Sequence, residues 1–286
     1  MASVLGVVPG EGAKKLTPSV VSSLKKEWTA GFDAWGRRDL SGTHFTSIYA
    51  DGVYQQIRGD NPKLCALVIV GSTRAARSTW WRSKTACASP HSPGEVLLDL
   101  KSRGMKAPAL AVGDGALGFW AALREVFGTT AHQRCWFHKS GNILNYLPKS
   151  VQSKARSDLS EIWMAPSRKE AGKAITLFRE KYEDKYPKAV GCLTKDAEEL
   201  SAFYDFPAVH WPHIRTTNAI ESTFATLRHR TVGVKGAFSQ ETAMAMMFQL
   251  ALEPEKSWRR IKGSERLAEV IQGVRFIDGE AQALAG

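Results

Sequence analysis

The sequence has little of what marks secreted or membrane proteins. Its 286 residues include only four cysteines, and the scattered spacing of Cys65, Cys87, Cys135 and Cys192 forms no disulfide framework. No apolar run approaches the roughly 18–20 residues that cross a bilayer. The opening residues, MASVLGVVPGEGAKK, show neither a basic leader nor a cleavage site. We therefore expect a protein of the reducing cytoplasm without a membrane segment.

Acidic residues are also scarce. The chain has 39 Lys and Arg against 28 Asp and Glu, which gives a formal net charge of +11, and residues 61–94 contain no acid at all. An excess of positive charge attracts polyanions, of which nucleic acid is the simplest. A merely basic surface is the alternative. Charge therefore favours a DNA or RNA partner without naming an activity.

What is present predicts an α/β protein in which strands come first and helices follow. Segment 17–28 predicts a short helix, either an ordinary amphipathic one or the second helix of a helix-turn-helix. Strands are predicted at 44–59, with a tight turn at Asp51-Gly52, and also at 63–71 and 108–113. Further helices are predicted at 95–103, at 116–127, through most of 139–205, at 216–231 and at 240–262.

One stretch, APALAVGDGALGFWAALREVF, places Asp114 between two glycines where a predicted strand passes into a helix. Gly113, Gly115 and Gly118 fit the spacing of a dinucleotide-binding turn. However, residues 132–140 contain no carboxylate to hold a ribose, and an aspartate inside the turn would repel a pyrophosphate. The competing interpretation is that Asp114 itself binds a metal ion.

Two other carboxylates can complete a metal site with Asp114. Asp51 lies in the first predicted strand pair and Glu221 on a predicted helix. Each acid also has a local interpretation: a hairpin turn at Asp51, a helix cap at Asp114, and a capping box from Asn218 to Glu221. Two-metal phosphoryl chemistry needs acids that converge from separate elements, and Mg²⁺ prefers carboxylate oxygens. Together the three acids favour metal-assisted chemistry.

Five stretches carry a resemblance to a known family: YADGVY, LAVGDGALGFWAALREVF, QRCWFHK, LTKDAEELSAFYDFPAVHW and RTTNAIESTFATLRHRT. They resemble bacterial insertion-sequence transposases of the Mutator type, N-terminally truncated, from about residue 15 to 277. The resemblance implies a DDE transposase with a ribonuclease-H-like mixed sheet and a helical insertion before the catalytic glutamate. Residues 1–43 would be a remnant of an N-terminal helical DNA-binding region. Residues 44–286 would be the catalytic domain, with the insertion at about 139–210.

The resemblance also implies the chemistry. Asp51, Asp114 and Glu221 would form the catalytic triad and hold two divalent ions, Mg²⁺ or Mn²⁺, while DNA is cut and joined during transposition of an insertion sequence. The implied partners are the terminal repeats of the element and its target DNA. A homo-oligomer is expected when the enzyme is active, located in the cytoplasm at the nucleoid.

Basic residues follow the glutamate. Arg228 lies seven residues after Glu221, so both share one face of the predicted helix. We therefore predict that Arg228, Arg230 and Lys235 bind DNA phosphates beside the metal ions. A solvated basic face is the alternative.

The family signature Cys-x-x-His is matched by Cys135 and His138. Its spacing is that of half a zinc site, and His210 and His213 would supply the other pair. The interpretation that we favour is that Cys135 and His138 pack and orient groups near the active site.

Residues 72–94, STRAARSTWWRSKTACASPHSPG, depart from the family pattern. They contain no acid and alternate poorly, which is what a pair of compensating frameshifts would produce. We expect the third strand of the sheet, which lies at an edge, to pair poorly there. The alternative function is therefore a catalytically inactive, truncated or frameshifted remnant that only binds DNA.

Overall fold

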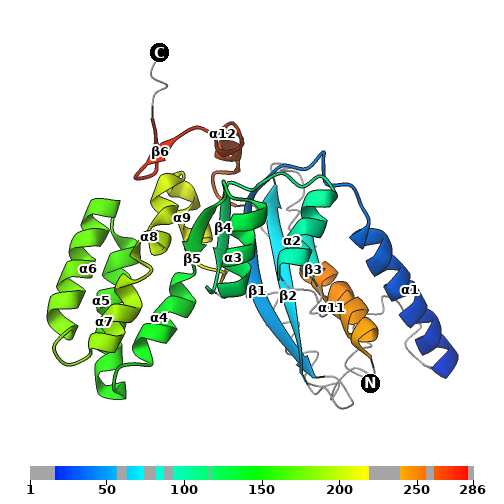
Figure 1. Cartoon of the computed structure of the whole chain (residues 1–286), viewed down its shortest axis with the longest axis horizontal. Coiled ribbons are helices and arrows are strands. Elements are labelled where there is room, and N and C mark those ends of the chain that lie inside the picture. The colour runs from blue at the N-terminus through cyan, green and yellow to red at the C-terminus, as the bar shows by residue number, and fades with distance from the viewer. Residues whose placement is uncertain are drawn as a thin grey trace.

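A computed structural model describes residues 17–56, 63–73, 82–86, 93–115, 117–218, 239–255 and 261–282. In this part of the chain a five-stranded mixed sheet stands between two groups of helices (Figure 1). The strands are β1 (Phe45–Gln56), β2 (Lys63–Thr73), β3 (Arg82–Ala86), β4 (Leu110–Gly113) and β5 (Ala131–Arg134). Their order is β3-β2-β1-β4-β5, with β1 to β3 antiparallel and β1, β4 and β5 mutually parallel. The predicted α/β class is confirmed.

One face of the sheet is covered by α2 (Pro93–Ser102) and α3 (Leu117–Val126). Side chains alternate along a strand, so Ile48 and Ala50 of β1 point to this face. There they pack with Leu97 of α2 and with Trp120 and Leu123 of α3. This side holds the smaller of the two apolar cores.

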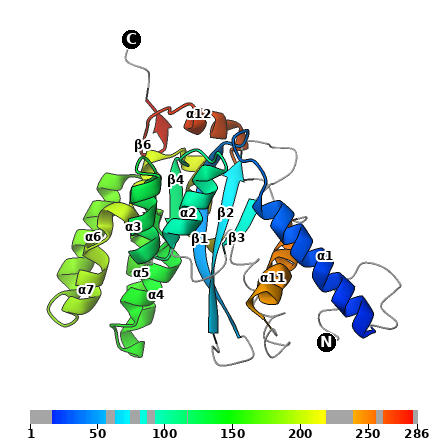
Figure 2. The same ribbon diagram turned by 45° about the vertical axis from the view of Figure 1, so that its right-hand side comes forward.

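The other face carries the larger core and most of the helices (Figure 2). The helices are α4 (Trp136–Leu144), α5 (Lys149–Met164), α6 (Arg168–Tyr182), α7 (Pro187–Thr194), α8 (Ala197–Leu200), η3 (Ala202–Asp205), η4 (Ala208–His210), α9 (Trp211–Ile214) and α11 (Gln240–Glu255). Prolines mark their boundaries as predicted: Pro148 precedes α5, Pro166 separates α5 from α6, and Pro187 begins α7. The helical stretch predicted from 139 is therefore confirmed.

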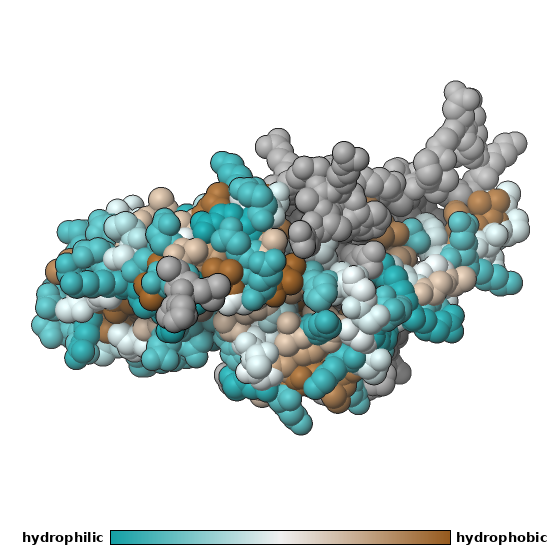
Figure 3. Space-filling model, turned by 90° about the horizontal axis from the view of Figure 1, so that it is seen from above, coloured by the Kyte–Doolittle hydropathy of each residue, from teal (hydrophilic) through white to brown (hydrophobic). Residues whose placement is uncertain are grey.

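The last described segment returns to this block. It contains η5 (Ser264–Arg266), α12 (Leu267–Ile271) and a short hairpin of β6 (Phe276–Ile277) with β7 (Glu280–Ala281). No helix in the described ranges has both the length and the apolar character to cross a bilayer. Seen from above, hydrophilic residues cover much of the molecule and hydrophobic patches lie among them (Figure 3).

The N-terminal helix α1 (Pro18–Gly36) begins where the sequence predicts. The Thr17 side chain accepts a hydrogen bond from the Val20 N–H at 3.4 Å, and Pro18 occupies the first turn. The helix runs beyond the predicted end because its second half packs on α11. There the Phe32 and Trp35 rings lie 5.6 and 5.2 Å from the Phe248 ring. The second half of the helix is therefore fixed by aromatic contacts with α11.

The structure corrects the predicted turn at Asp51-Gly52. Strand β1 runs without interruption through both residues, and Asp51 pairs with Val68 and Gly52 with Leu67 on β2. An Asp-Gly pair forms a tight turn only when the flanking segments pair with each other. Here both flanks pair with β2 instead, so the backbone stays extended.

The structure also differs from expectation within residues 72–94. Strand β3, residues 82–86, pairs antiparallel with β2 from Leu67↔Ala86 to Gly71↔Arg82. The sheet therefore has its edge strand, although poor alternation predicted weak pairing. A strand whose outer edge lies at the sheet boundary needs only one partner ladder, which backbone groups of any sequence can supply.

Candidate active site

The two aspartates lie side by side at the ends of neighbouring parallel strands. The β1–β4 ladder ends at the pair Ala50↔Gly113, and Asp51 and Asp114 are the next residues. Adjacent strands are about 4.8 Å apart. Tertiary structure thus brings together two half-buried carboxylates that are far apart in the chain.

Both aspartates face the helical block. Tyr49 and Val112, two residues before Asp51 and Asp114, are buried in the core beneath α4, and strand side chains repeat every second residue. The charges of both aspartates also act on His138 of α4. The pKa of His138 rises to about 9. The hydrogen bond with the Cys135 thiol raises the pKa most, burial lowers it, and the charges of Asp51 and Asp114 raise it further. The imidazole therefore carries a positive charge next to the two acids.

The glycines around Asp114 have geometric roles. A Cβ on Gly113 would lie 3.2 Å from the ring of Trp120, so the missing side chain lets α3 approach β4 closely. Gly115 has φ +93°, in the region that favours glycine, and a Cβ there would lie 1.9 Å from the Arg134 guanidinium carbon. The absence of side chains at Gly113 and Gly115 thus lets the backbone take its path on either side of Asp114.

Strand β5 brings Cys135 next to Asp114. The β4–β5 ladder ends at Gly113↔Arg134, and the Cys135 N–H donates to the Gly113 carbonyl at 2.8 Å. Helix α4 begins immediately afterwards, at Trp136. The sequence did not predict β5, because its four residues, AHQR, show little apolar character. The sequence did predict Cys135 near the active site, and the pairing of β5 with β4 supplies the structural reason.

The Cys135 thiol fixes the segment that leads to Glu221. It is 1% exposed, accepts a hydrogen bond from the Thr217 N–H at 3.2 Å and lies 3.3 Å from the Thr217 hydroxyl. Burial disfavours the thiolate, but hydrogen bonds with His138 and Thr217 outweigh it and lower the pKa of Cys135. The Trp136 N–H also donates to the Arg215 carbonyl at 3.0 Å. These contacts hold the chain four residues before Glu221.

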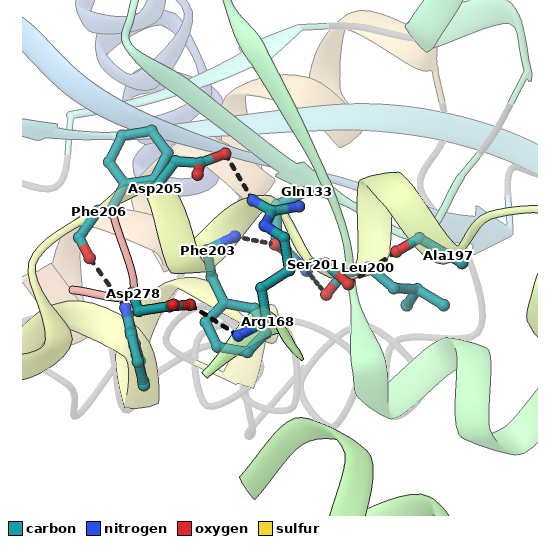
Figure 4. A network of polar contacts seen from close by, with 10 residues as sticks. Gln133, Arg168, Ala197, Leu200, Ser201, Phe203, Asp205, Phe206 and Asp278 are labelled. Carbon is teal, nitrogen blue, oxygen red and sulfur yellow. Dashed lines mark hydrogen bonds and ion pairs between the residues drawn. The ribbon is translucent and has the colours of Figure 1, made fainter. Parts of the chain in front are cut away.

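A buried glutamine ties the same strand to the helical block. Gln133 is fully buried, and its side-chain oxygen accepts from the Phe203 N–H at 2.8 Å (Figure 4). Its amide nitrogen donates to the Leu200 carbonyl at 3.2 Å, and the Trp136 indole N–H donates to the same carbonyl at 2.8 Å. These hydrogen bonds hold the junction of β5 and α4 against the segment around Leu200 and Phe203.

A buried lysine and a half-buried arginine share one carboxylate. Lys139, 1% exposed in α4, and Arg134, at the end of β5, both form ion pairs with Asp196; the Arg134 pair is 3.5 Å long. Removing one partner from such a buried group leaves an uncompensated charge. This triad therefore stabilises the junction between β5, α4 and the loop before α8.

The zinc alternative is not supported. His210 Nε2 lies 2.8 Å from the Gly263 carbonyl oxygen, and His213 Nε2 accepts from the Lys262 N–H at 3.3 Å. Both rings thus bind the segment after α11, away from Cys135. Across the described ranges, no three His, Cys, Asp or Glu side chains form a metal-binding group. Glu221, the predicted third ligand, is not among these residues.

The structure does not describe every predicted site residue. Glu221, Arg228, Arg230 and Lys235 lie outside the described residues. Asp51, Asp114, Cys135 and His138 lie within them, and the structure brings all four together. Sequence reasoning did not foresee that His138 faces both aspartates.

Comparison with known proteins now identifies the class of protein. The family described as "Transposase, Mutator family" matches residues 7–260, most of the chain. The sheet with two acids at the ends of its parallel strands thus lies in a transposase. The chain belongs to the Mutator family of transposases.

Individual relatives are transposases of insertion sequence elements. The chain is 46% identical to the transposase of element IST2 from Acidithiobacillus ferrooxidans, over 98% of this chain and 95% of that protein. It is 42% identical to the IS6120 transposase from Mycolicibacterium smegmatis, over 94% and 84% of the respective chains. The match to the ISRM5 transposase of Rhizobium meliloti, at 26% identity, covers 84% of this chain and 61% of that protein. Relatives of this chain therefore differ considerably in length.

Proposed function

We propose that the protein cuts DNA at the ends of an insertion sequence and transfers the strand to a target, with Asp51, Asp114 and Glu221 as the catalytic carboxylates. The observation that carries this proposal is the placement of Asp51 and Asp114 side by side on one face of the sheet. In the sheet, β1, β2 and β3 are antiparallel, and β4 and β5 lie parallel to β1. This order fits a ribonuclease-H-like catalytic domain in residues 44–286. The helical insertion would span about residues 139–210, and residues 1–43 would belong to a DNA-binding region.

The two aspartates fit a divalent metal ion. They offer carboxylate oxygens, which Mg²⁺ and Mn²⁺ prefer, at one point where their negative charges reinforce each other. Glu221 would supply the third carboxylate. Two bound ions would provide Lewis-acid activation of the scissile phosphate and of the attacking hydroxyl.

The protein's own groups have separate roles in this proposal. Cys135 holds the Thr217 backbone and so positions the segment that bears Glu221. The His138 imidazole, near both acids, would donate a ring N–H hydrogen bond to a DNA phosphate at the site. Both are positioning and electrostatic roles around the carboxylates.

We further propose that DNA is held by positive charge beyond the carboxylates. Arg228, Arg230 and Lys235 would bind phosphates of the element end and of the target DNA. The net charge of +11 supports this. Since transposition joins two ends to one target, a homo-oligomer is the proposed active form, at the nucleoid in the cytoplasm.

The test is nicking of supercoiled plasmid by purified protein with Mg²⁺ or Mn²⁺, beside the variants Asp114→Asn and Asp184→Asn. Asp184 is exposed and distant in sequence from the site, so it is the matched control. We expect metal-dependent nicks from the parent and from Asp184→Asn, and a loss of at least about a hundredfold in Asp114→Asn. Circular dichroism confirms that each protein is folded.

Two outcomes would contradict the proposal. Nicks that persist in Asp114→Asn would show that another group, or a contaminating nuclease, cuts the DNA. A folded parent protein that retards DNA in a gel shift but never nicks it would establish the alternative, a remnant that only binds DNA.

A further inference from the structure

A pocket of about 650 Å³ opens between α4, α5 and the segment around Arg215, and it shares His138 with the surroundings of the two aspartates. His138 lines this pocket and also faces Asp51 and Asp114. The pocket therefore begins where the proposed active site ends. Its volume is in the range of sites that enclose small organic ligands.

The walls of the pocket are aromatic. Phe137, with 58% of its surface exposed, and the half-buried Trp163 line it, and the fully buried Trp136 packs behind Trp163 with their ring centroids 5.4 Å apart. Phe137 and Trp163 therefore offer aromatic surface to an occupant of the pocket. Flat apolar walls favour a flat partner that stacks on them.

The rim of the pocket is polar and basic. Asn142, Asn145, Arg156 and Arg215 line it, and none of its lining residues in the described part of the chain is acidic. Arg156 lies seven residues before Trp163 in α5, two helical turns away, so both share one face of the helix. The occupant should therefore have a flat apolar face, hydrogen-bonding edges and an attached negative charge.

We propose that this pocket receives a nucleobase turned out of the DNA strand that the aspartates engage. The aromatic walls would stack the base, the asparagine amides would bind its edge, and Arg156 would bind its phosphate. The inference rests on the proposed function, because it takes DNA to be the substrate. It adds a base-binding site to the carboxylates that would cut the strand.

The test compares two 20-residue oligonucleotides by fluorescence anisotropy, without metal so that nothing is cut. One is oligothymidylate, and the other has the same phosphates but abasic sugars throughout. We expect the parent protein to bind the base-bearing strand roughly five- to hundredfold more tightly, the range for stacking of one base. Phe137→Ala should bring this ratio close to one, and Phe137→Trp should restore it. Because Phe137 is exposed, its replacement leaves the fold intact.

Two further variants sharpen the test. Met164→Ala is the matched control, because Met164 is 63% exposed next to Trp163 but does not line the pocket, and it should leave the ratio unchanged. Arg156→Gln should weaken binding of both strands by the same factor, as loss of a phosphate contact does.

A ratio near one in the parent, or a ratio that Phe137→Ala leaves unchanged, would overturn the inference. So would an equal effect of Met164→Ala, which would indicate non-specific apolar binding. The outcome is distinguishable from that of the nicking assay. A protein that does not nick DNA but keeps its base preference would contradict only the proposed catalysis. A protein that nicks DNA but has no base preference would contradict only the proposed base-binding pocket.

Discussion

Replacing Gln133 by leucine tests how the structure holds β5 against the helical block. Leucine fills a similar volume but can neither donate nor accept a hydrogen bond. The fully buried Phe203 N–H would lose its acceptor at 2.8 Å, whereas the Leu200 carbonyl would keep the Trp136 indole N–H. An unpaired buried donor costs about 1–3 kcal/mol. The two bonds that the Gln133 amide nitrogen donates, to the Leu200 and Arg134 carbonyls, would also be lost and together add about 0.5–1 kcal/mol. We therefore expect the free energy of unfolding to fall by about 1.5–4 kcal/mol.

Urea unfolding followed by circular dichroism measures this change. The midpoint should fall while the slope with urea stays the same, and the melting temperature should drop by roughly 3–16 °C. Gln272→Leu, at an exposed position after α12, is the matched control and should stay within about 0.5 kcal/mol of the parent. If Gln133→Leu changes stability no more than the control does, the Phe203 N–H is satisfied in another way and the reasoning is refuted.

The double variant Gln133→Leu with Trp136→Phe adds an internal check. Both side chains donate to the Leu200 carbonyl, so removing both leaves that group without either donor. The double variant should therefore lose more stability than the two single variants combined, by about 0.5–3 kcal/mol. Simple additivity would mean that the two hydrogen bonds act independently.

Two other predictions concern a glycine and a histidine. Gly115→Ala should lower the free energy of unfolding by about 1–2 kcal/mol, because φ is +93° and the new Cβ would meet Arg134. Gly36→Ala is the control, because open space surrounds that position, and it should not destabilise the protein. Equal effects of the two variants in chemical unfolding would contradict this prediction. Burial lowers the pKa of His210, so below about pH 6.5 the unfolded chain takes up the proton first and stability falls as pH falls. His210→Gln should flatten the drop in melting temperature between pH 7.5 and 5.5, and an unchanged drop would show that His210 does not cause it.

Much of this protein can be predicted from local sequence. Thr17 and Pro18 set the start of α1, and Pro148 and Pro187 mark the starts of α5 and α7. The strand that ends before Asp114 and the helix that follows it are also predicted locally. These structural signals are reliable because each depends on residues within about one turn or one strand of one another.

Other features appear only when distant strands pair. The sequence alone determined the α/β class, the helical block and the aspartate at the end of β4. Tertiary structure decided that β1 runs straight through Asp51, that β5 exists, and that Cys135 meets Thr217 beside both acids. The physical reason is that an extended backbone is stabilised by its neighbours. A short segment such as AHQR becomes a strand when β4 supplies its hydrogen bonds. The residues of the segment itself do not indicate which strand it will pair with.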